Sequence, residues 1–578
     1  MLRKFSVVIG LTVFLLTLCG LSHADRLYTK GDAVSVYADA VFQPNELFER
    51  YDFYSLPFCR PAEVKLEAQK LWDILYGSAK RTSSYQLFFA TNSTGVKLCR
   101  KSLNKDKKDD FVDAVRRNYM FSMHVDDFEL THNIGWGGEK DGAVLITGLL
   151  FKIFFNADRI VKAHVESLET QRVVLSAEPQ EIDFTYSVLW FETNHNRGSL
   201  NLGAIDLDEE VVRIQWISIV NSFVIVILLS GFVLFILART LRRDFQRYGS
   251  LEEEMDEEDI GWKRLHADVF RFPRNKMLLC AVSGCGAQLL LVAFVTLMIA
   301  WKNVLNGKEG AMINTVMPLF LLTAPVSGYV SGSLYKKLEG EHWSRSVCLT
   351  FLMLFAPFFV VCVTVNVVAS ISVSAYAVPW GRFCFFCVFF VSATFPLILL
   401  GAVLGKRFCG PFAAPTRTKF VPREIPPLPW YRRTLLHVVI GGLLPFMAIY
   451  IELHYILVGL WTTRLHTPVA FILIMFLVLV VVTASEGIAL TYDRLGAENH
   501  NWWWPSVLCG GSTAVYVFVY CAVFYFGMTP QIFSGLSLVI FFGYTLFICH
   551  CLFLSMATVS FCSSLLFVKQ IYRYIKSD

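Results

Sequence analysis

The sequence predicts a polytopic α-helical membrane protein with nine transmembrane helices and an N-terminal, mostly-β lumenal domain. Of its 578 residues, 55% are hydrophobic and only 17% are charged. Beyond residue 213 the apolar residues form uninterrupted blocks, each near the ~20 residues that a bilayer core requires, and do not follow the periods of soluble helices and strands. The net charge of +5 does not indicate a nucleic-acid partner, because the basic residues lie in short loops between the apolar blocks, where they orient the chain in the lipid bilayer.

The N-terminal part divides into a leader and a soluble domain. Residues 1–24 have the basic start, the apolar core and the small residues before a cut that are typical of a signal peptide. Residues 25–213 are mixed in polarity and long enough for one lumenal domain of ordinary size. The alternating runs VSVYADAVF, AVLITGLLFKIFF and IDFTYSVLWF in this region predict strands.

The rest of the chain alternates apolar blocks with charged loops. We expect a first transmembrane helix at 214–238, a cytosolic loop at 239–276, an eight-helix transmembrane domain at 277–568 and a cytosolic tail at 569–578. The nine apolar blocks lie approximately at 215–238, 277–300, 311–334, 346–371, 383–405, 437–460, 468–491, 505–527 and 535–567. The cytosolic loops of this topology are rich in lysine and arginine, as the positive-inside rule requires, and the short lumenal loops hold only Lys302, Lys308, Arg382 and Arg464.

The predicted lumenal domain carries two sites of covalent modification. Cys59 and Cys99 are the only cysteines of its mature sequence, and an oxidising compartment favours a disulfide between them. Asn92 begins an Asn-Ser-Thr sequon and is a predicted glycosylation site. The CFFC run at Cys384 and Cys387 has the spacing of redox or metal motifs, but it lies in an apolar block without a second ligand pair, which favours ordinary helix packing. We therefore predict no metal and no cofactor.

Three ionisable residues lie inside apolar blocks: Glu452 and His454 in the sixth block and Glu486 in the seventh. Such groups cost several kcal/mol unless they are paired or hydrated, so they are candidates for an intramembrane polar site. Glu452 and Glu486 sit at comparable places in consecutive blocks and can be expected to face one cavity. The alternative is that each accepts hydrogen bonds from a neighbouring helix and fixes the packing.

Other motifs point away from catalysis. The run WWWP at the start of the eighth block predicts an aromatic anchor at the membrane interface. The sequence has no phosphate-cradling glycine loop, no GxSxG nucleophile motif and no paired metal-ligand spacing in a soluble region. An enzyme is therefore not expected.

Several unusual runs resemble those of one family. RTLRRDFQRY followed by GWKRLHADVFRFP is similar to the signature of the nonaspanins, the transmembrane nine superfamily, also described as endomembrane protein 70-like. YDFYSLPFCRP, GYVSGSLYKKLEGEHW, PTRTKFVPREIPPLPWY and ENHNWWWPS then resemble further family blocks in the family's order. Two elements depart from the pattern: DDFELTHNIG replaces the usual DDLPxWG-like segment, and the Trp-Asp element before the first span is not visible.

The resemblance has implications for the end of the chain and for function. Family members end in a Lys-x-Asp or Lys-x-Glu signal that vesicle coats of the COPI type read, and Lys576 and Asp578 match it. The alternative is a basic flank that anchors the last helix at the membrane surface. The resemblance implies a sorting receptor or chaperone of Golgi and endosomal membranes, whose partners are coat proteins and membrane-protein cargo with Gly-rich spans. Two alternatives are a secondary transporter or channel that uses Glu452 and Glu486, and a receptor for a lumenal ligand.

Overall fold

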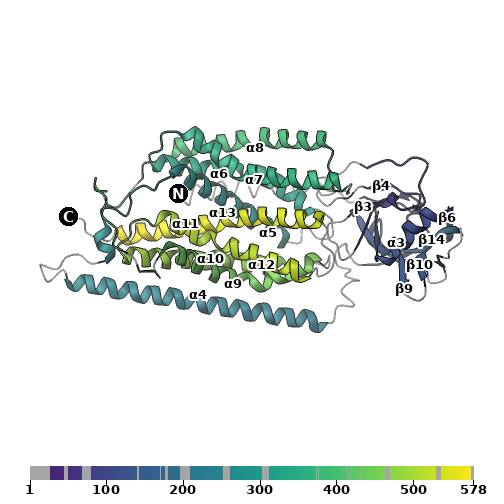
Figure 1. The fold of residues 1–578 in the computed structure, drawn as a ribbon, viewed down its shortest axis with the longest axis horizontal. Coiled ribbons are helices and arrows are strands. Elements are labelled where there is room, and N and C mark those ends of the chain that lie inside the picture. Colours follow the sequence, from purple (N-terminus) through teal and green to yellow (C-terminus); the bar gives the residue numbers. More distant parts are fainter. Residues whose placement is uncertain are drawn as a thin grey trace.

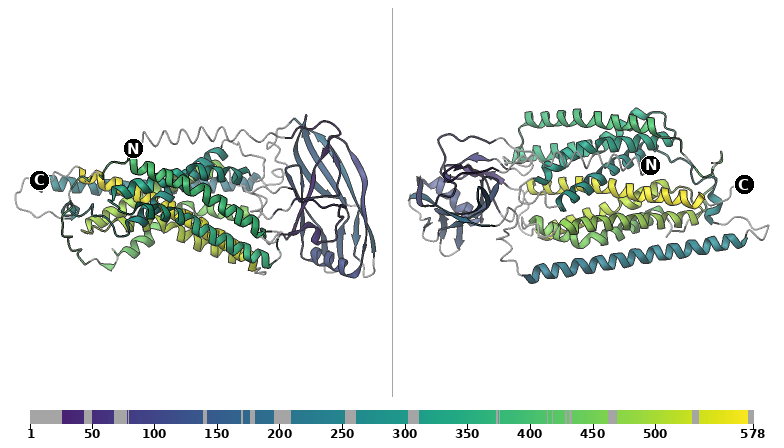
Figure 2. Two further views of the ribbon diagram at one scale, coloured as in Figure 1. Left: turned by 90° about the horizontal axis from the view of Figure 1, so that it is seen from above. Right: turned by 180° about the vertical axis from the view of Figure 1, so that it is seen from behind.

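The N-terminal strands fold into a β domain that caps one end of a long helical bundle (Figure 1). The computed structural model describes residues 26–43, 50–67, 78, 80–138, 142–168, 171–175, 180–194, 209–251, 261–301, 311–372, 374, 376–412, 414–416, 418–427, 429–430, 433–461, 469–528 and 535–573. The predicted signal peptide and the last five residues of the predicted tail lie outside this range. The strands run across the direction of the helices (Figure 2).

The β domain contains short and long strands and one helix. Its elements are β1 (Ala33–Val34), β2 (Val36–Phe42), β3 (Arg50–Asp52), η1 (Phe53–Ser55), β4 (Arg81–Thr82), β5 (Leu87–Phe88), β6 (Ser93–Leu103), α3 (Lys105–Arg116), β7 (Met120–Val125), β8 (Phe128–Asn133), β9 (Gly135–Gly138), β10 (Gly142–Ile146), β11 (Gly148–Asn156), β12 (Arg159–Ser167), β13 (Arg172–Val174) and β14 (Gln180–Glu192). The three alternating runs of the sequence form β1 and β2, β10 and β11, and β14, which confirms the mostly-β prediction.

Two larger sheets share the core of this domain. One sheet has the strand order β12-β11-β14-β6, with β11 and β14 parallel, and the other has the order β3-β2-β7-β8, with β4 paired to β2. Each strand alternates side chains between its two faces, so every second residue of β14 points inward. Ala38 and Phe121 from one sheet and Phe151 and Tyr186 from the other belong to a single buried cluster. Their burial stabilises the packing of the two sheets.

The bundle consists of long apolar helices. These are α4 (Glu209–Leu251), α5 (Lys276–Trp301), α6 (Ala311–Lys337), α7 (Trp343–Ile371), α8 (Trp380–Phe408), α9 (Thr434–Trp461), α10 (Val469–Gly496), α11 (Trp503–Gly511), α12 (Thr513–Met528) and α13 (Gly535–Arg573). Within the described residues, eight spans are long and apolar enough to cross a membrane, with α11 and α12 forming one of them. The remaining predicted span, the first in the chain, lies in α4, which packs beside α9 and α10 at the edge of the bundle (Figure 1). The architecture is that of the predicted nine-span protein.

Two helices extend beyond their predicted spans. α4 has 43 residues and is therefore ~65 Å long, so it continues past the predicted span into the predicted loop as far as Leu251. α13 has 39 residues, runs unbroken to Arg573 and lies in the middle of the bundle, where it packs against α5, α7, α10, α11 and α12.

The eighth predicted span is interrupted at Ser512, whose hydroxyl lies 2.7 Å from the carbonyl oxygen of Val438 on α9. This hydroxyl ties the interruption to a neighbouring helix.

Glycines allow α6 and α8 to pack backbone against backbone. Gly328 and Gly332 on α6, and Gly401 and Gly405 on α8, repeat at intervals of four residues and face the partner helix. A Cβ atom added at Gly401 would clash with the carbonyl oxygen of Pro325. Without a hydrophobic drive between helices in lipid, such close contact supplies the dispersion energy that holds them together. α6 stays helical through Pro325, so the proline does not unwind the helix around a site.

We predict that Gly401→Ala destabilises the bundle by about 1–3 kcal/mol, because the new methyl group must push α6 away. Gly381→Ala is the matched control, since a Cβ at this earlier position of α8 has no neighbour within 4 Å. Thermal unfolding of the purified full-length protein measures both variants. An equal melting temperature for Gly401→Ala and Gly381→Ala would contradict the close α6–α8 contact.

Candidate functional site

Glu452 and Glu486 lie along the seam where α9 packs on α10. Ala448 of α9 and Val482 of α10 are both buried and touch at the middle of this seam. Glu452 follows Ala448 by four residues and Glu486 follows Val482 by four, so each carboxylate lies about one turn from the contact. Because the consecutive helices run antiparallel, the two turns lead in opposite directions, and the carboxylates differ in depth by ~12 Å. The apolar contact of Ala448 with Val482 separates them.

Both carboxylates are buried and incompletely hydrogen-bonded. Glu452 is 3% exposed and Glu486 is 8% exposed. Neither oxygen of Glu452, nor Oε2 of Glu486, has a hydrogen-bond partner among the described residues. The hydrogen bonds that a pure packing role would require are therefore not made by Glu452 within the described chain. Buried polar atoms of this kind mark functional positions in membrane helices.

His454 does not join these carboxylates. Two residues along a helix lie on nearly opposite faces, so His454 points away from Glu452. Its side chain is exposed at the bundle surface, and its Nδ1 lies 2.8 Å from the hydroxyl of Tyr520 on α12. The structure therefore splits the three candidate residues into two carboxylates on one seam and a histidine that pairs α9 with α12.

Segments far apart in the sequence meet at the bundle end that lies away from the β domain. We call their buried cluster the collar: residues 261–270, which begin with η2 (Gly261–Leu265), residues 502–503 and residues 568–572. Trp502 is fully buried, stacks on Trp503 with ring centroids 4.5 Å apart, and donates from Nε1 to the carbonyl oxygen of Val269 at 2.8 Å. The interpretation of WWWP as an anchor in the membrane interface is therefore wrong for Trp502 and Trp503, which pack inside the protein.

Ion pairs close the rim of the collar. Glu498, in the loop after α10, contacts Arg264 at 3.4 Å and Arg423 at 3.2 Å. Asp268 pairs with Arg271 at 2.7 Å. The runs GWKRLHADVFRFP, PTRTKFVPREIPPLPWY and ENHNWWWPS thus contribute to one connected structure, which sequence periodicity alone does not reveal. The sequence signal that could have indicated this structure is the aromatic and charged content that the three runs share.

The collar also holds the last turn of α13. The hydroxyl of Tyr572 donates to the carbonyl oxygen of Trp262 at 2.6 Å, and Val568 and Ile571 are buried beside it. α13 ends at Arg573. The predicted sorting residues, Lys576 and Asp578, lie outside the described residues and follow this fixed point by a few positions.

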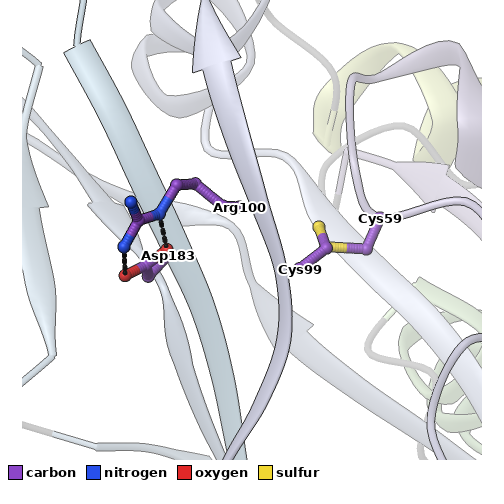
Figure 3. Close-up of a disulfide and its surroundings, with 4 residues drawn as sticks. All are labelled: Cys59, Cys99, Arg100 and Asp183. Carbon is purple, nitrogen blue, oxygen red and sulfur yellow. Dashed lines mark hydrogen bonds and ion pairs between the residues drawn. A yellow bond between two sulfur atoms is a disulfide. The ribbon is translucent and has the colours of Figure 1, made fainter.

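Cys59 and Cys99 form a disulfide in the β domain, with their Cα atoms 6.0 Å apart (Figure 3). The bond ties the segment after η1 to β6. The next residue of β6, Arg100, points to the other face and donates from Nε and Nη2 to the two oxygens of Asp183 on β14, at 2.8 Å and 3.1 Å. Hydrogen bonds from Arg100 and Lys97 lower the pKa of Asp183 to about 2.

Asn92 lies just before β6, with its side chain exposed. Its Oδ1 accepts a hydrogen bond from the backbone N–H of Trp190 at 2.8 Å, which fixes the side chain. The amide nitrogen that carries a glycan is on the other side of the same group. Glycosylation of Asn92 stays a prediction that this exposed position allows.

A buried ionic cluster lies where the β domain meets the bundle. Arg50 of β3, which is 4% exposed, contacts Asp39 at 3.6 Å and Glu129 at 2.8 Å. His124 lies 3.9 Å from Asp39. Ser374, in the connection between α7 and α8, donates to the carbonyl oxygen of Arg50 at 3.2 Å. No sequence pattern indicates this cluster, because its members come from separate strands and from the connection between α7 and α8.

The pKa of Glu129 is held below its ordinary value. Burial alone would raise this pKa, but the charges of Arg50 and His124 and the hydrogen bonds from Ser122 and Arg50 outweigh burial. A carboxyl with a lowered folded-state pKa stabilises the fold above its unfolded pKa of about 4.3, and this stabilisation is lost as the pH falls through the folded-state value.

We predict that Glu129→Gln lowers the stability of the β domain at neutral pH by about 3 kcal/mol, because it leaves Arg50 buried without its closest carboxylate. The difference from the unchanged protein should shrink below about pH 4. Hydrogen exchange of β-domain peptides in the full-length protein, measured from pH 7 to pH 3, tests this. The control is Glu63→Gln, which removes an acid from an exposed pair with Lys65 and should change nothing measurable. A pH-independent effect of Glu129→Gln would contradict the assignment.

An apolar groove lies between α7 and α8. Six phenylalanines and two cysteines line it: Phe355, Phe358, Phe359, Cys362, Phe383, Phe386, Cys387 and Phe390. Of the eight apolar spans found in the described residues, α8 is the least buried, with 11% of its most apolar stretch enclosed. Among the described residues, no cluster of His, Cys, Asp and Glu has the form of a metal site, and Cys384 and Cys387 point to different surroundings, one exposed and one in the groove.

The fold and these sites define a multi-pass membrane protein with an N-terminal β domain. The family described as Endomembrane protein 70 matches residues 50–536 of the chain. Transmembrane 9 superfamily member 4 of Arabidopsis thaliana is 38% identical over 573 residues, which cover 96% of this chain and 95% of that relative. Transmembrane 9 superfamily member 1 of Bos taurus is 36% identical over 573 residues, covering 95% and 94%. The chain belongs to the transmembrane 9 superfamily, which confirms the resemblance found in its motifs.

Membership places the chain among membrane proteins of the endomembrane system. The names that these relatives carry are not those of enzymes. No solved structure matches the fold.

Proposed function

We propose that this protein is a sorting receptor or chaperone of Golgi and endosomal membranes that assists the surface delivery of other membrane proteins. Its membership in an endomembrane family supports this proposal. In this proposal, the β domain faces the lumen and the collar faces the cytosol. The cargo is a membrane protein whose transmembrane helix is rich in glycine.

The groove between α7 and α8 is the observation that carries the proposal. It lies beside the outer face of α8, where Phe385, Val388 and Phe389 are exposed and a second transmembrane helix can approach from the lipid. Its lining consists of rings and thiols without a charged group. A glycine-rich helix face has no side chains to keep a partner at a distance, so aromatic rings can pack directly against its backbone. We infer that such a helix face fits this groove.

A secondary transporter is the second candidate, favoured by the unpartnered oxygens of Glu452 and Glu486. The contact of Ala448 with Val482 between these carboxylates argues against a continuous polar path. The helices α6 and α9 also remain helical through Pro325 and Pro445, whereas transporters use broken helices at their sites. Both observations disfavour a transporter.

We predict that Phe386→Ala weakens the binding of a glycine-rich transmembrane client severalfold and lowers its surface level, since one aromatic contact is worth on the order of 1 kcal/mol. Phe385→Ala is the matched control, because the neighbouring ring is 74% exposed and lies outside the groove. Client recovery by co-purification and surface labelling measure both variants. Equal client levels for both would contradict the groove. A solute flux in liposomes that disappears with Glu452→Gln would instead favour the transporter.

We propose that the end of the chain carries the coat signal. The collar holds α13 at Tyr572, and Lys576 and Asp578 follow that residue by four and six positions in the sequence. One cation and two terminal carboxylates form a compact charged target.

Appending three alanines after Asp578 is predicted to shift the protein away from the Golgi, because the signal includes the terminal carboxylate. Replacing Lys576 and Asp578 with alanine should have the same effect. Fluorescence microscopy against a Golgi marker measures the shift. A basic flank at the membrane surface would tolerate the extension, so an unchanged location of the extended protein would contradict the coat signal.

A further inference from the structure

We propose that Arg494 and the first turn of α9 form a binding site for the phosphate group of an anionic membrane phospholipid. The site lies at the collar end of the bundle, where α9 begins and α10 ends. It is separate from the client groove and from the tail, and it does not depend on the sorting function.

Arg494 is the centre of this site. Its side chain is 4% exposed, and its Nη1 donates to the hydroxyl of Thr434, the first residue of α9, at 3.4 Å. Its Nε and Nη2 are buried and have no acceptor among the described residues. These two nitrogens form the edge of the guanidinium that binds two oxygens of one carboxylate or phosphate. Arg100 uses the same edge to bind both oxygens of Asp183 in the β domain.

The start of α9 supplies further donors. The first helical hydrogen bond joins the N–H of His437 to the carbonyl oxygen of Arg433 at 3.3 Å, so the N–H groups of Thr434, Leu435 and Leu436 have no acceptor within the helix. The positive end of the helix dipole lies at the same place and favours an anion. Arg433, directly before the helix, adds an exposed positive charge.

The acidic group beside the site does not neutralise it. Asp493 precedes Arg494 on α10 and lies 3.4 Å from Nε2 of the buried His437. Its carboxylate contacts the histidine and also acts on Arg494 through its charge, while the buried Nε and Nη2 of Arg494 keep no hydrogen-bond acceptor among the described residues. With Asp493 counted, Arg433, Arg494 and the positive helix end still leave a positive local balance.

The surface next to the site indicates a lipid as the source of the phosphate. Leu435, Val439, Leu443 and Met447 are exposed, and their spacing of four residues places them on one face of α9. This apolar stripe starts at the first turn of the helix and runs towards the middle of the membrane. An acyl chain can lie along it while the phosphate binds at Arg494, whereas free phosphate would gain nothing from the stripe.

The test uses the purified full-length protein and a fluorescent phosphatidic acid, with phosphatidylcholine as the uncharged-headgroup comparison. Arg494→Gln should weaken phosphatidic acid binding about tenfold. Arg494→Lys should weaken it less, because lysine keeps the positive charge but lacks the paired N–H donors of the guanidinium. Arg407→Gln, at an exposed arginine in the last turn of α8, is the matched control and should bind like the unchanged protein. Unchanged binding by Arg494→Gln would overturn the proposal.

A second measurement needs no substitution. Phosphatidic acid with a photoreactive acyl chain should label peptides within residues 433–447 of the unchanged protein, and phosphatidylcholine with the same chain should label them weakly. Uniform labelling of all spans, or equal labelling by both lipids, would overturn the proposal. Protection of the site from labelling by millimolar inorganic phosphate as complete as that by unlabelled phosphatidic acid would show a free-anion site and would overturn the assignment to a lipid.

Discussion

The burial of Trp502 is the interaction on which the collar end of the bundle depends. Its ring is fully enclosed, and its Nε1 hydrogen bond to Val269 joins the start of α11 to the segment before α5. Tyr572 bonds that same segment through Trp262, so α13 is tied to it as well. A large buried ring contributes on the order of 2–3 kcal/mol through burial alone, and its polar nitrogen requires the partner that Val269 supplies. Three distant parts of the chain are thereby fixed against one another.

The collar and the β domain give the two ends of the protein different roles. At the β-domain end, the Arg50 cluster meets the connection between α7 and α8 through Ser374, which is also where the groove-lining helices meet the soluble domain. At the collar end, the last turn of α13 and the first turn of α9 lie in a fixed frame. Between these ends, glycines let α6 and α8 pack closely, while the outer face of α8 stays open to lipid.

The sequence predicted the architecture because bilayer thickness and strand alternation leave plain periodic signals. The apolar blocks became long helices, and the three alternating runs became strands. The sites were harder to predict from the sequence, since they depend on how the helices face one another. Comparable positions in consecutive spans suggested one cavity for Glu452 and Glu486, but antiparallel helices place them at different depths around Ala448 and Val482. WWWP has the composition of an interfacial anchor, and only tertiary packing shows that Trp502 and Trp503 belong to the core. The unpartnered Nε and Nη2 of Arg494 likewise leave no signal in the sequence.

Hydrogen exchange of the full-length protein tests the central claim, that Trp502 locks the collar, most directly. In the unchanged protein, peptides covering residues 261–270 and 568–572 should exchange slowly, because both are held in one buried cluster. Trp502→Ala should raise exchange in both segments together and leave the β domain unchanged, whereas Trp380→Ala, at a tryptophan that is 48% exposed, should raise it in neither. An increase confined to the residues around position 502 would contradict the account.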